Sequence, residues 1–245
     1  MHKSICLILV IFVFAVNSFS QNGTASKQPV GEKTIAAPTT PLDVAKAALA
    51  AHGGDKLKQM KSLVMKGSVD LNVNNQGLPG AFSTAISGEK YFFEINSVVQ
   101  SLKQVFDGRQ TYSSIPGFSL PPFTSLGFPV LTKVGDAGYV ISALGDDKKK
   151  KRGFRITTPD GFYTDFFVDE KTGQIKGYES SYEVGSRLIT TSVEIDEFLT
   201  VEGILVPKKY SQRFDLGQLT AYASFKTKSI LVNSPIEDAA FAIPK

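Results

Sequence analysis

The chain contains no tryptophan, one cysteine and two histidines. Cys6 and His2 lie in the first twenty residues, so His52 is the single histidine beyond them. A zinc site needs three or four ligands, mostly histidine or cysteine, and a serine–histidine–aspartate triad needs a histidine base. No Gly-x-Ser-x-Gly or Gly-x-x-x-x-Gly-Lys-Ser/Thr motif is present either. These absences argue against zinc enzymes, triad hydrolases and phosphate-loop enzymes.

The remaining acid–base candidates are one histidine and three carboxylate clusters. His52 stands at the expected end of a helix, where a cationic ring would interact favourably with the helix dipole. Paired carboxylates cleave glycosides in some enzymes, and the clusters here are Asp146–Asp147, Asp169–Glu170 and Glu194–Glu197. Because these clusters lie in expected turns or on polar strand faces, we interpret them as solvated. We predict no catalytic residue, no metal and no cofactor.

The amino terminus has the three parts of a secretory signal. Lys3 precedes an apolar run, Ile5–Val16, which is followed by small residues at Ser18 and Ser20. The run is well short of the roughly 20 residues that a membrane-spanning helix needs. We therefore expect cleavage before Gln21 rather than a membrane anchor.

Domain organisation and location follow from this signal. Residues 1–20 are predicted to be a signal peptide, residues 21–40 a flexible polar leader, and residues 41–245 one domain. A lipid-modified cysteine would follow the apolar run, whereas Cys6 lies near its beginning. The formal net charge of +4 is too small to indicate nucleic-acid binding. We predict a periplasmic protein that is not a lipoprotein.

One helix is expected at the start of the domain. Thr40 and Asp43 have the spacing of a capping box, Pro41 suits the first turn, and Gly53–Gly54 marks the end. The apolar stripe of the predicted helix Pro41–His52 indicates that it lies against a sheet.

Strands dominate the rest of the chain. Alternating apolar and polar residues, separated by short turns, predict antiparallel strands at residues 63–73, 82–87, 90–96, 98–106, 110–115, 139–144, 154–158, 162–168, 175–182, 187–197, 208–214 and 219–227. We expect a mainly β fold in which about ten or eleven strands form an antiparallel meander and an unclosed barrel around the helix.

Two segments interrupt the alternation. Residues 116–130 contain four prolines, which exclude a central strand, and five large apolar residues, which are Phe118, Leu120, Phe123, Leu126 and Phe128. An apolar loop of this kind either plugs the core or acts as a lid. Five consecutive basic residues, Lys148, Lys149, Lys150, Lys151 and Arg152, form either a solvated hairpin tip or a contact with anionic lipid head groups.

Five sequence pieces carry a resemblance to a known family. They are Ala47–Leu57, the Val105–Gly108 turn leading to Tyr112, Val168–Gly173, Gly203–Pro207, and Val232–Asp238 with Phe241. With these pieces the chain resembles the LolA/LolB-like superfamily of periplasmic lipoprotein carriers, from Pro41 onward. The resemblance implies an unclosed barrel covered by helices, whose apolar hollow binds acyl chains of lipoproteins or other amphiphiles.

We therefore predict a non-catalytic carrier that binds lipid or lipoprotein acyl chains, contacts a membrane surface transiently and has an envelope protein as a possible partner. A protein-interaction or sensor module on the same fold is the alternative, followed by a carboxylate-dependent hydrolase. Within each predicted strand, the apolar residues of the alternating pattern are expected to face inward, toward either the core or a ligand. These are Met65, Val69, Leu71, Phe93, Ile95, Phe154, Ile156, Phe162, Phe166, Val193, Ile195, Phe214 and Phe225.

Overall fold

The computed structural model describes residues 40–73, 76–98, 101–114, 127–148, 151–184, 187–215 and 220–244. The predicted signal peptide, residues 21–39 of the predicted leader, and Phe118, Leu120, Phe123, Leu126, Lys149 and Lys150 lie outside these residues. The described elements all belong to one unit, Ala37–Lys245.

The predicted first helix is confirmed as α1 (Pro41–Ala51), with His52 as its C-terminal cap. The Thr40 hydroxyl accepts a hydrogen bond from the Asp43 backbone N–H at 3.2 Å, and the Asp43 carboxylate accepts one from the Thr40 N–H at 3.3 Å. This reciprocal pair satisfies two backbone donors that an α-helix leaves open at its start. A one-turn helix, α2 (Asp55–Lys58), follows.

In the described residues, twelve strands form a single antiparallel sheet. This number equals the twelve ranges predicted from alternation and exceeds the ten or eleven strands expected in the meander. The strands are β1 (Ser62–Val73), β2 (Gln76–Ser87), β3 (Lys90–Ser97), β4 (Ser101–Phe106), β5 (Thr111–Ser113), β6 (Val140–Ser142), β7 (Gly153–Thr157), β8 (Tyr163–Val168), β9 (Ile175–Val184), β10 (Arg187–Val201), β11 (Ile204–Asp215) and β12 (Thr220–Val232). Short 3-10 turns add η2 (Phe128–Lys133), η3 (Asp146–Lys148) and η4 (Asp238–Phe241).

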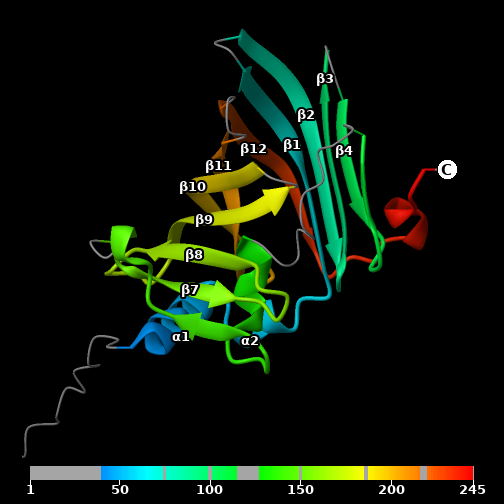
Figure 1. Cartoon of the computed structure of the whole chain (residues 1–245). Coiled ribbons are helices and arrows are strands. Elements are labelled where there is room, and N and C mark those ends of the chain that lie inside the picture. Colours follow the sequence, from blue (N-terminus) through cyan, green and yellow to red (C-terminus); the bar gives the residue numbers. More distant parts are fainter. Residues whose placement is uncertain are drawn as a thin grey trace, which may run out of the picture. The chain divides into compact units, whose positions relative to one another are not determined.

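The strand order is that of an opened barrel. It runs β5-β4-β3-β2-β1-β12-β11-β10-β9-β8-β7-β6, so neighbours in sequence pair from β1 to β5 and from β6 to β12, and the first strand pairs with the last. The sheet ends at β5 and β6, which do not pair with each other. In Figure 1 the direction of the strands turns from β1–β4 to β7–β9, which places two parts of the sheet opposite one another.

Strand β2 begins at Gln76 rather than at residue 82, and β12 ends at Val232 rather than at residue 227. Strand β11 begins at Ile204, whereas alternation predicted a start at Lys208. Proline has no backbone N–H, so Pro207 argued against a strand there. The structure explains the exception, because Pro207 is paired with Phe198 of β10, while pairing with β12 begins only at Lys209. Pro207 therefore occupies a position with one strand neighbour, where a missing N–H is tolerated.

Two apolar clusters cover the two faces of the sheet. The larger cluster joins the inner face to α1, α2 and η2, and α1 lies against β6 and β7. A smaller cluster on the other side seats Phe241 of η4 against Ala85 and Val105. None of the helices in the described part of the chain has both the length and the apolar character that crossing a membrane requires.

Candidate functional site

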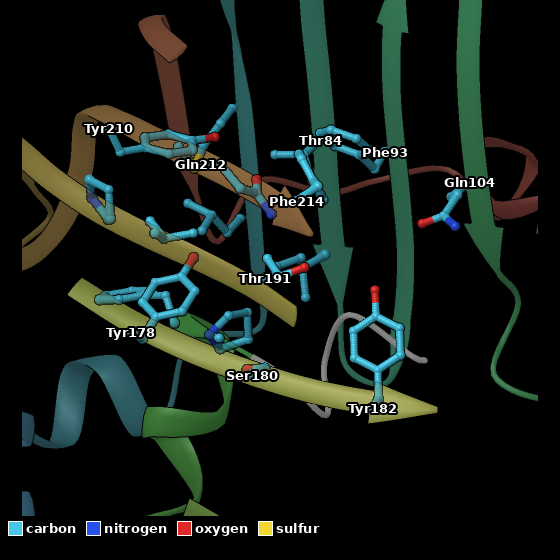
Figure 2. A pocket seen from close by; sticks show the side chains of 18 residues that line it. Thr84, Phe93, Gln104, Tyr178, Ser180, Tyr182, Thr191, Tyr210, Gln212 and Phe214 are labelled. Atoms are coloured by element: carbon cyan, nitrogen blue, oxygen red, sulfur yellow. The ribbon is translucent and has the colours of Figure 1, made fainter. Parts of the chain in front are cut away.

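A partly open pocket lies between the two opposed parts of the sheet. One wall comes from β1, β2, β3 and β4, the other from β9, β10 and β11, and the start of η2 closes the pocket on a third side. Figure 2 shows the side chains of these strands extending into the same space. Strands distant in sequence meet here because β1 pairs with β12 and brings the two ends of the meander together.

The pocket has a cavity volume of about 100 Å³ and mainly apolar walls. Among the described residues, its lining contains no Asp, Glu, Lys, Arg or His side chain. The lining residues are Leu63, Met65, Thr84, Ile86, Phe93, Gln104, Gly127, Phe128, Pro129, Tyr178, Ser180, Tyr182, Thr191, Val193, Pro207, Tyr210, Gln212 and Phe214. A site of this composition suits an uncharged or apolar part of a ligand.

Gly127 and Tyr178 form one side of the pocket together. Gly127 has φ +69°, a left-handed conformation that favours glycine, and a Cβ at this position would lie 2.8 Å from Cε2 of Tyr178. The Gly127 N–H donates a hydrogen bond to the Thr164 hydroxyl at 3.1 Å. The glycine therefore lets the chain entering η2 pass directly beneath the Tyr178 ring.

Four of the residues predicted from strand alternation line the pocket, namely Met65, Phe93, Val193 and Phe214, and Phe128 of the predicted loop joins them. The other predicted lining residues lie elsewhere. Val69, Ile95, Phe154, Ile156, Phe166 and Phe225 are buried in the larger cluster, Leu71 and Ile195 pack against it, and Phe162 is partly buried outside it.

For Phe154, Ile156 and Phe166 the reason is the position of α1. This helix lies against β6 and β7, and the Phe154 and Phe166 rings stack at 5.2 Å in the core, so protein rather than open space covers the inner face there.

Sequence reasoning missed the polar part of the lining. Thr191 and Gln212 each lie two residues before a predicted lining residue on the same strand, Val193 and Phe214. The period of two therefore placed them on the inner face, but only apolar residues were selected. The tyrosines of β9, Tyr178 and Tyr182, alternate with Ser180 on the same face and were missed too.

His52 is fully buried and uses both ring nitrogens. Its Nε2 accepts a hydrogen bond from the Ile175 N–H at 3.0 Å, which places the ring proton on Nδ1, and Nδ1 donates to the Leu205 carbonyl at 3.0 Å. Burial lowers the pKa of His52, although the Leu205 carbonyl acts in the opposite direction. The expectation of a cationic helix-end ring was therefore wrong, because the neutral ring is the one that these contacts select.

Mild acid is expected to destabilise the protein through His52. Its pKa is lowered in the folded state, so below the ordinary histidine pKa of about 6.5 the unfolded chain binds a proton that the folded chain resists. The unfolding free energy should decrease by up to about 1.4 kcal/mol for each pH unit below that value. Urea unfolding measured between neutral pH and about pH 5 tests this. A His52→Gln variant should show a shallower dependence, and an equal slope would contradict the assignment.

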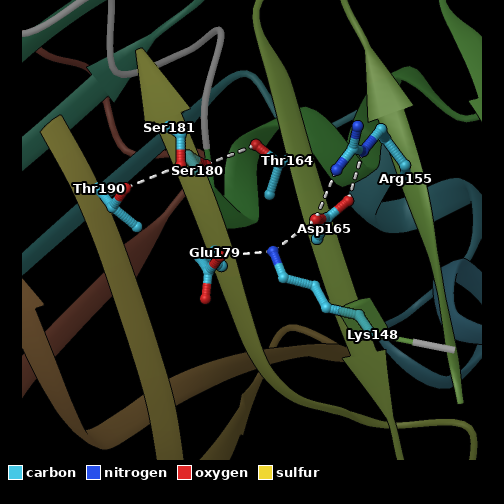
Figure 3. A network of polar contacts seen from close by, with 8 residues as sticks. All are labelled: Lys148, Arg155, Thr164, Asp165, Glu179, Ser180, Ser181 and Thr190. Carbon is cyan, nitrogen blue, oxygen red and sulfur yellow. Dashed lines mark hydrogen bonds and ion pairs between the residues drawn. The ribbon is translucent and has the colours of Figure 1, made fainter. Parts of the chain in front are cut away.

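A buried carboxylate, Asp165, pairs with two cations on the face of β8 that points away from the larger apolar cluster. Asp165 is fully buried and accepts hydrogen bonds from Nε and Nη2 of Arg155, at 2.6 and 2.9 Å, and from Nζ of Lys148 at 2.9 Å. Burial alone would raise the pKa of Asp165, but the hydrogen bonds from Arg155 and Lys148 outweigh it and lower the pKa. Lys148 also pairs with Glu179. Figure 3 shows the network crossing β7, β8 and β9.

An Asp165→Asn substitution is expected to lower the unfolding free energy by about 2 kcal/mol, because it leaves two partly buried cations without their carboxylate. Chemical denaturation measures the change. Glu197→Gln is the matched control, since Glu197 pairs with Lys208 and Lys209 at the surface, where ion pairs contribute little. Equal effects of the two substitutions would contradict a special role of burial.

Two members of the predicted carboxylate clusters, Glu197 and Asp169, have properties opposite to those of a general acid. Hydrogen bonds from Lys208 and Lys209 lower the pKa of Glu197 to about 2. Hydrogen bonds from Lys176 and from the backbone of its own turn lower the pKa of Asp169. A glycosidase acid needs a raised pKa, so neither group is suited to that role.

The described residues of the basic run, Lys148, Lys151 and Arg152, do not form one continuous basic patch, because Lys148 and Lys151 have different partners. Lys148 is directed to Asp165 and Glu179, which removes it from the predicted head-group contact. Nζ of Lys151 lies 4.4 Å from the centre of the Phe167 ring. Lys151 and Arg152 are the described residues of the run that are still candidates for such a contact.

Comparisons with known proteins give a match in structure but not in sequence. No protein-family model matches the chain, and no curated protein matches it. A LolA superfamily protein from Nitrosomonas europaea is similar in structure, with a TM-score of 0.51 and 12% identity over 84% of this chain and 98% of that one.

Two further solved structures are similar. A DUF1329 family protein from Desulfovibrio piger has a TM-score of 0.49 and 12% identity over 83% of this chain and 98% of that one. A domain from Vibrio parahaemolyticus, described as a putative outer membrane lipoprotein-sorting protein domain, has a TM-score of 0.41 and 10% identity over 82% of this chain and 95% of that one. The chain has a LolA-like fold, and at these identities the likeness concerns the fold alone.

Proposed function

We propose that this protein is a non-catalytic carrier that binds the acyl chain of a lipoprotein or of another amphiphile in the pocket between β1–β4 and β9–β11. The observation that supports this most is the pocket itself, which is partly open, mainly apolar and free of charged side chains. The LolA-like fold agrees with the proposal.

The size of the pocket limits the length of hydrocarbon chain that it can hold. A cavity of about 100 Å³ is of the order of an engineered cavity, about 150 Å³, that binds benzene, so it accommodates a short stretch of hydrocarbon. Each buried methylene contributes about 0.8 kcal/mol, so even a few methylenes give measurable binding. A longer chain has to extend through the open side or separate the walls. Partial burial of the chain keeps release possible, as a carrier requires.

Export to the periplasm is part of the proposal, as is brief contact with a membrane surface. The signal-like residues 1–20 support export. Lys151 and Arg152 would contribute roughly 1 kcal/mol each near an anionic surface. The absence of catalysis is supported by His52, whose two ring nitrogens are both bonded to backbone groups and cannot serve as a base.

Titration with N-phenyl-1-naphthylamine, an uncharged dye that fluoresces in apolar sites, tests the proposal. We expect saturable fluorescence that medium-chain lipids displace, and co-purifying lipid in native mass spectra of protein isolated from a cell envelope. Protein that binds neither the dye nor lipid would overturn the carrier proposal. Recovery of one stoichiometric protein partner by such a lipid-free protein would favour the interaction module instead.

A further inference from the structure

Three polar atoms in the pocket have no hydrogen-bond partner within the described residues. They are Nε2 of Gln104 and the hydroxyl oxygens of Tyr182 and Thr191, and all are buried. Buried polar groups in native proteins are almost always paired, because an unpaired one costs stability. Three of them at one pocket therefore leave hydrogen bonds that the described residues do not complete and that a ligand could complete.

The three groups come from different strands that line the same pocket. Gln104 projects from β4, Tyr182 from β9 and Thr191 from β10, and Figure 2 shows the polar ends of Gln104 and Tyr182 extending into the hollow from opposite walls. Gln104 is 1% exposed and Tyr182 is 4% exposed. Water therefore does not reach these atoms in this structure, and a ligand reaches them when the pocket walls separate to admit it.

Neighbouring polar residues of the pocket are satisfied, which sets these three apart. The Thr84 hydroxyl donates to the Phe92 carbonyl at 3.0 Å, and Ser180 shares a hydrogen bond with Thr164 at 2.9 Å. The polar lining is thus divided into paired groups that hold the walls and unpaired groups that face the cavity.

The unpaired groups are mainly donors. The Gln104 amide nitrogen carries two hydrogens, and each hydroxyl carries one. Burial raises the pKa of Tyr182 to about 12, against a smaller opposite effect of the neighbouring Thr191 hydroxyl, so the phenol keeps its hydrogen at neutral pH. The Thr191 hydroxyl lies close enough to the Tyr182 hydroxyl to lower its pKa as a hydrogen-bond partner does, so these two groups can pair with each other. Even a bond between them would leave one hydroxyl hydrogen and the amide hydrogens to donate.

The charge of the pocket decides which acceptor fits. An ionised carboxylate or phosphate buried here would lose its hydration shell. No charged side chain among the described lining residues would pair with it in return. An ester or amide carbonyl is an uncharged acceptor with two lone pairs and is less costly to dehydrate. The apolar remainder of the pocket suits the hydrocarbon next to that carbonyl.

Resting on the proposed carrier function, we propose that Gln104, Tyr182 and Thr191 bind the ester or amide carbonyl of an acylated ligand. The pocket thereby selects acyl esters and amides over ionised free fatty acids of the same length.

Displacement of N-phenyl-1-naphthylamine by methyl decanoate, N-methyldecanamide and decanoate tests this at about pH 8, where decanoate is ionised. The ester and the amide should displace the dye at concentrations at least about tenfold lower than decanoate. Gln104→Leu, Tyr182→Phe and Thr191→Val should each weaken ester binding by about 2- to 10-fold. Each substitution should weaken binding of the ester more than binding of the dye, which has no carbonyl, and Tyr222→Phe, an exposed control, should change neither.

Stability without ligand provides a second readout. Removing an unpaired buried polar atom should raise the Tm of ligand-free Tyr182→Phe by about 2–5 °C, whereas removing a structural hydrogen bond would lower it. Decanoate that binds as tightly as the ester, or variants that lose dye and ester equally, would overturn the carbonyl site while the carrier function stands. Wild-type protein that binds no probe at all, the dye included, would overturn the carrier function itself.

Discussion

Replacing His52 by alanine is expected to lower the unfolding free energy by about 4 kcal/mol. The ring is fully buried and packs edge-on against Phe128 and Phe198, with centroids 5.3 and 5.1 Å away. Alanine leaves a cavity and deprives the Ile175 N–H and the Leu205 carbonyl of their partner. Cavity creation and two unpaired backbone groups act in the same direction.

The consequence extends beyond stability, because His52 connects the end of α1 to the starts of β9 and β11 and supports a pocket residue. Phe128 contacts His52 and also lines the pocket. His52→Ala should therefore weaken dye binding as well, by allowing the Phe128 ring to move.

Urea unfolding followed by circular dichroism measures the stability change. His52→Asn and His52→Gln are informative controls, because asparagine places a donor near the position of Nδ1 and glutamine places an acceptor near the position of Nε2. Each should be more stable than His52→Ala. Three variants of equal stability would show that the two hydrogen bonds contribute little and that packing alone accounts for the effect.

Filling the pocket is expected to abolish most of its affinity for apolar ligands. Val193 of β10 is 3% exposed and faces the cavity, so Val193→Trp places an indole ring in a space of about 100 Å³. Excluding about three methylenes of ligand removes roughly 2.4 kcal/mol of binding free energy, which corresponds to about 50-fold weaker binding.

Fluorescence titration of N-phenyl-1-naphthylamine measures this loss, with circular dichroism to verify that the variant is folded, since overpacking costs about 1–3 kcal/mol. Val140→Trp, at a 60% exposed position on β6, is the matched control and should bind as the wild type does. Leu63→Ala enlarges the same pocket and should favour bulkier probes. Unchanged affinity of folded Val193→Trp would place the binding site elsewhere.

Local signals in the sequence were sufficient to predict the helix α1 and most of the strands. Helix α1 was predicted within one residue because Thr40 and Asp43 specify its start and the Gly53–Gly54 pair its end. Most strands were predicted because a half-buried strand alternates apolar and polar side chains. The start of β11 was missed because the tolerance of Pro207 depends on how many strands flank it, which is a property of the sheet.

The candidate site was predicted only in part, for a physical reason. Met65 and Phe154 both occupy inner-face positions, yet Met65 lines the pocket and Phe154 is core. The difference arises because α1 lies over the β6–β7 end of the sheet and not over the pocket. Alternation identifies a buried face, whereas the covering elements determine whether that face meets protein or open space.

The sequence by itself determined the helix, the strands and their antiparallel succession, because each depends on residues close together in the chain. Only the tertiary structure decided the pairing of β1 with β12, the burial of His52 as a neutral ring and the meeting of Gln104 with Tyr182 across one pocket. These features join residues far apart in sequence, and their energies depend on packing and dehydration that exist only in the folded chain.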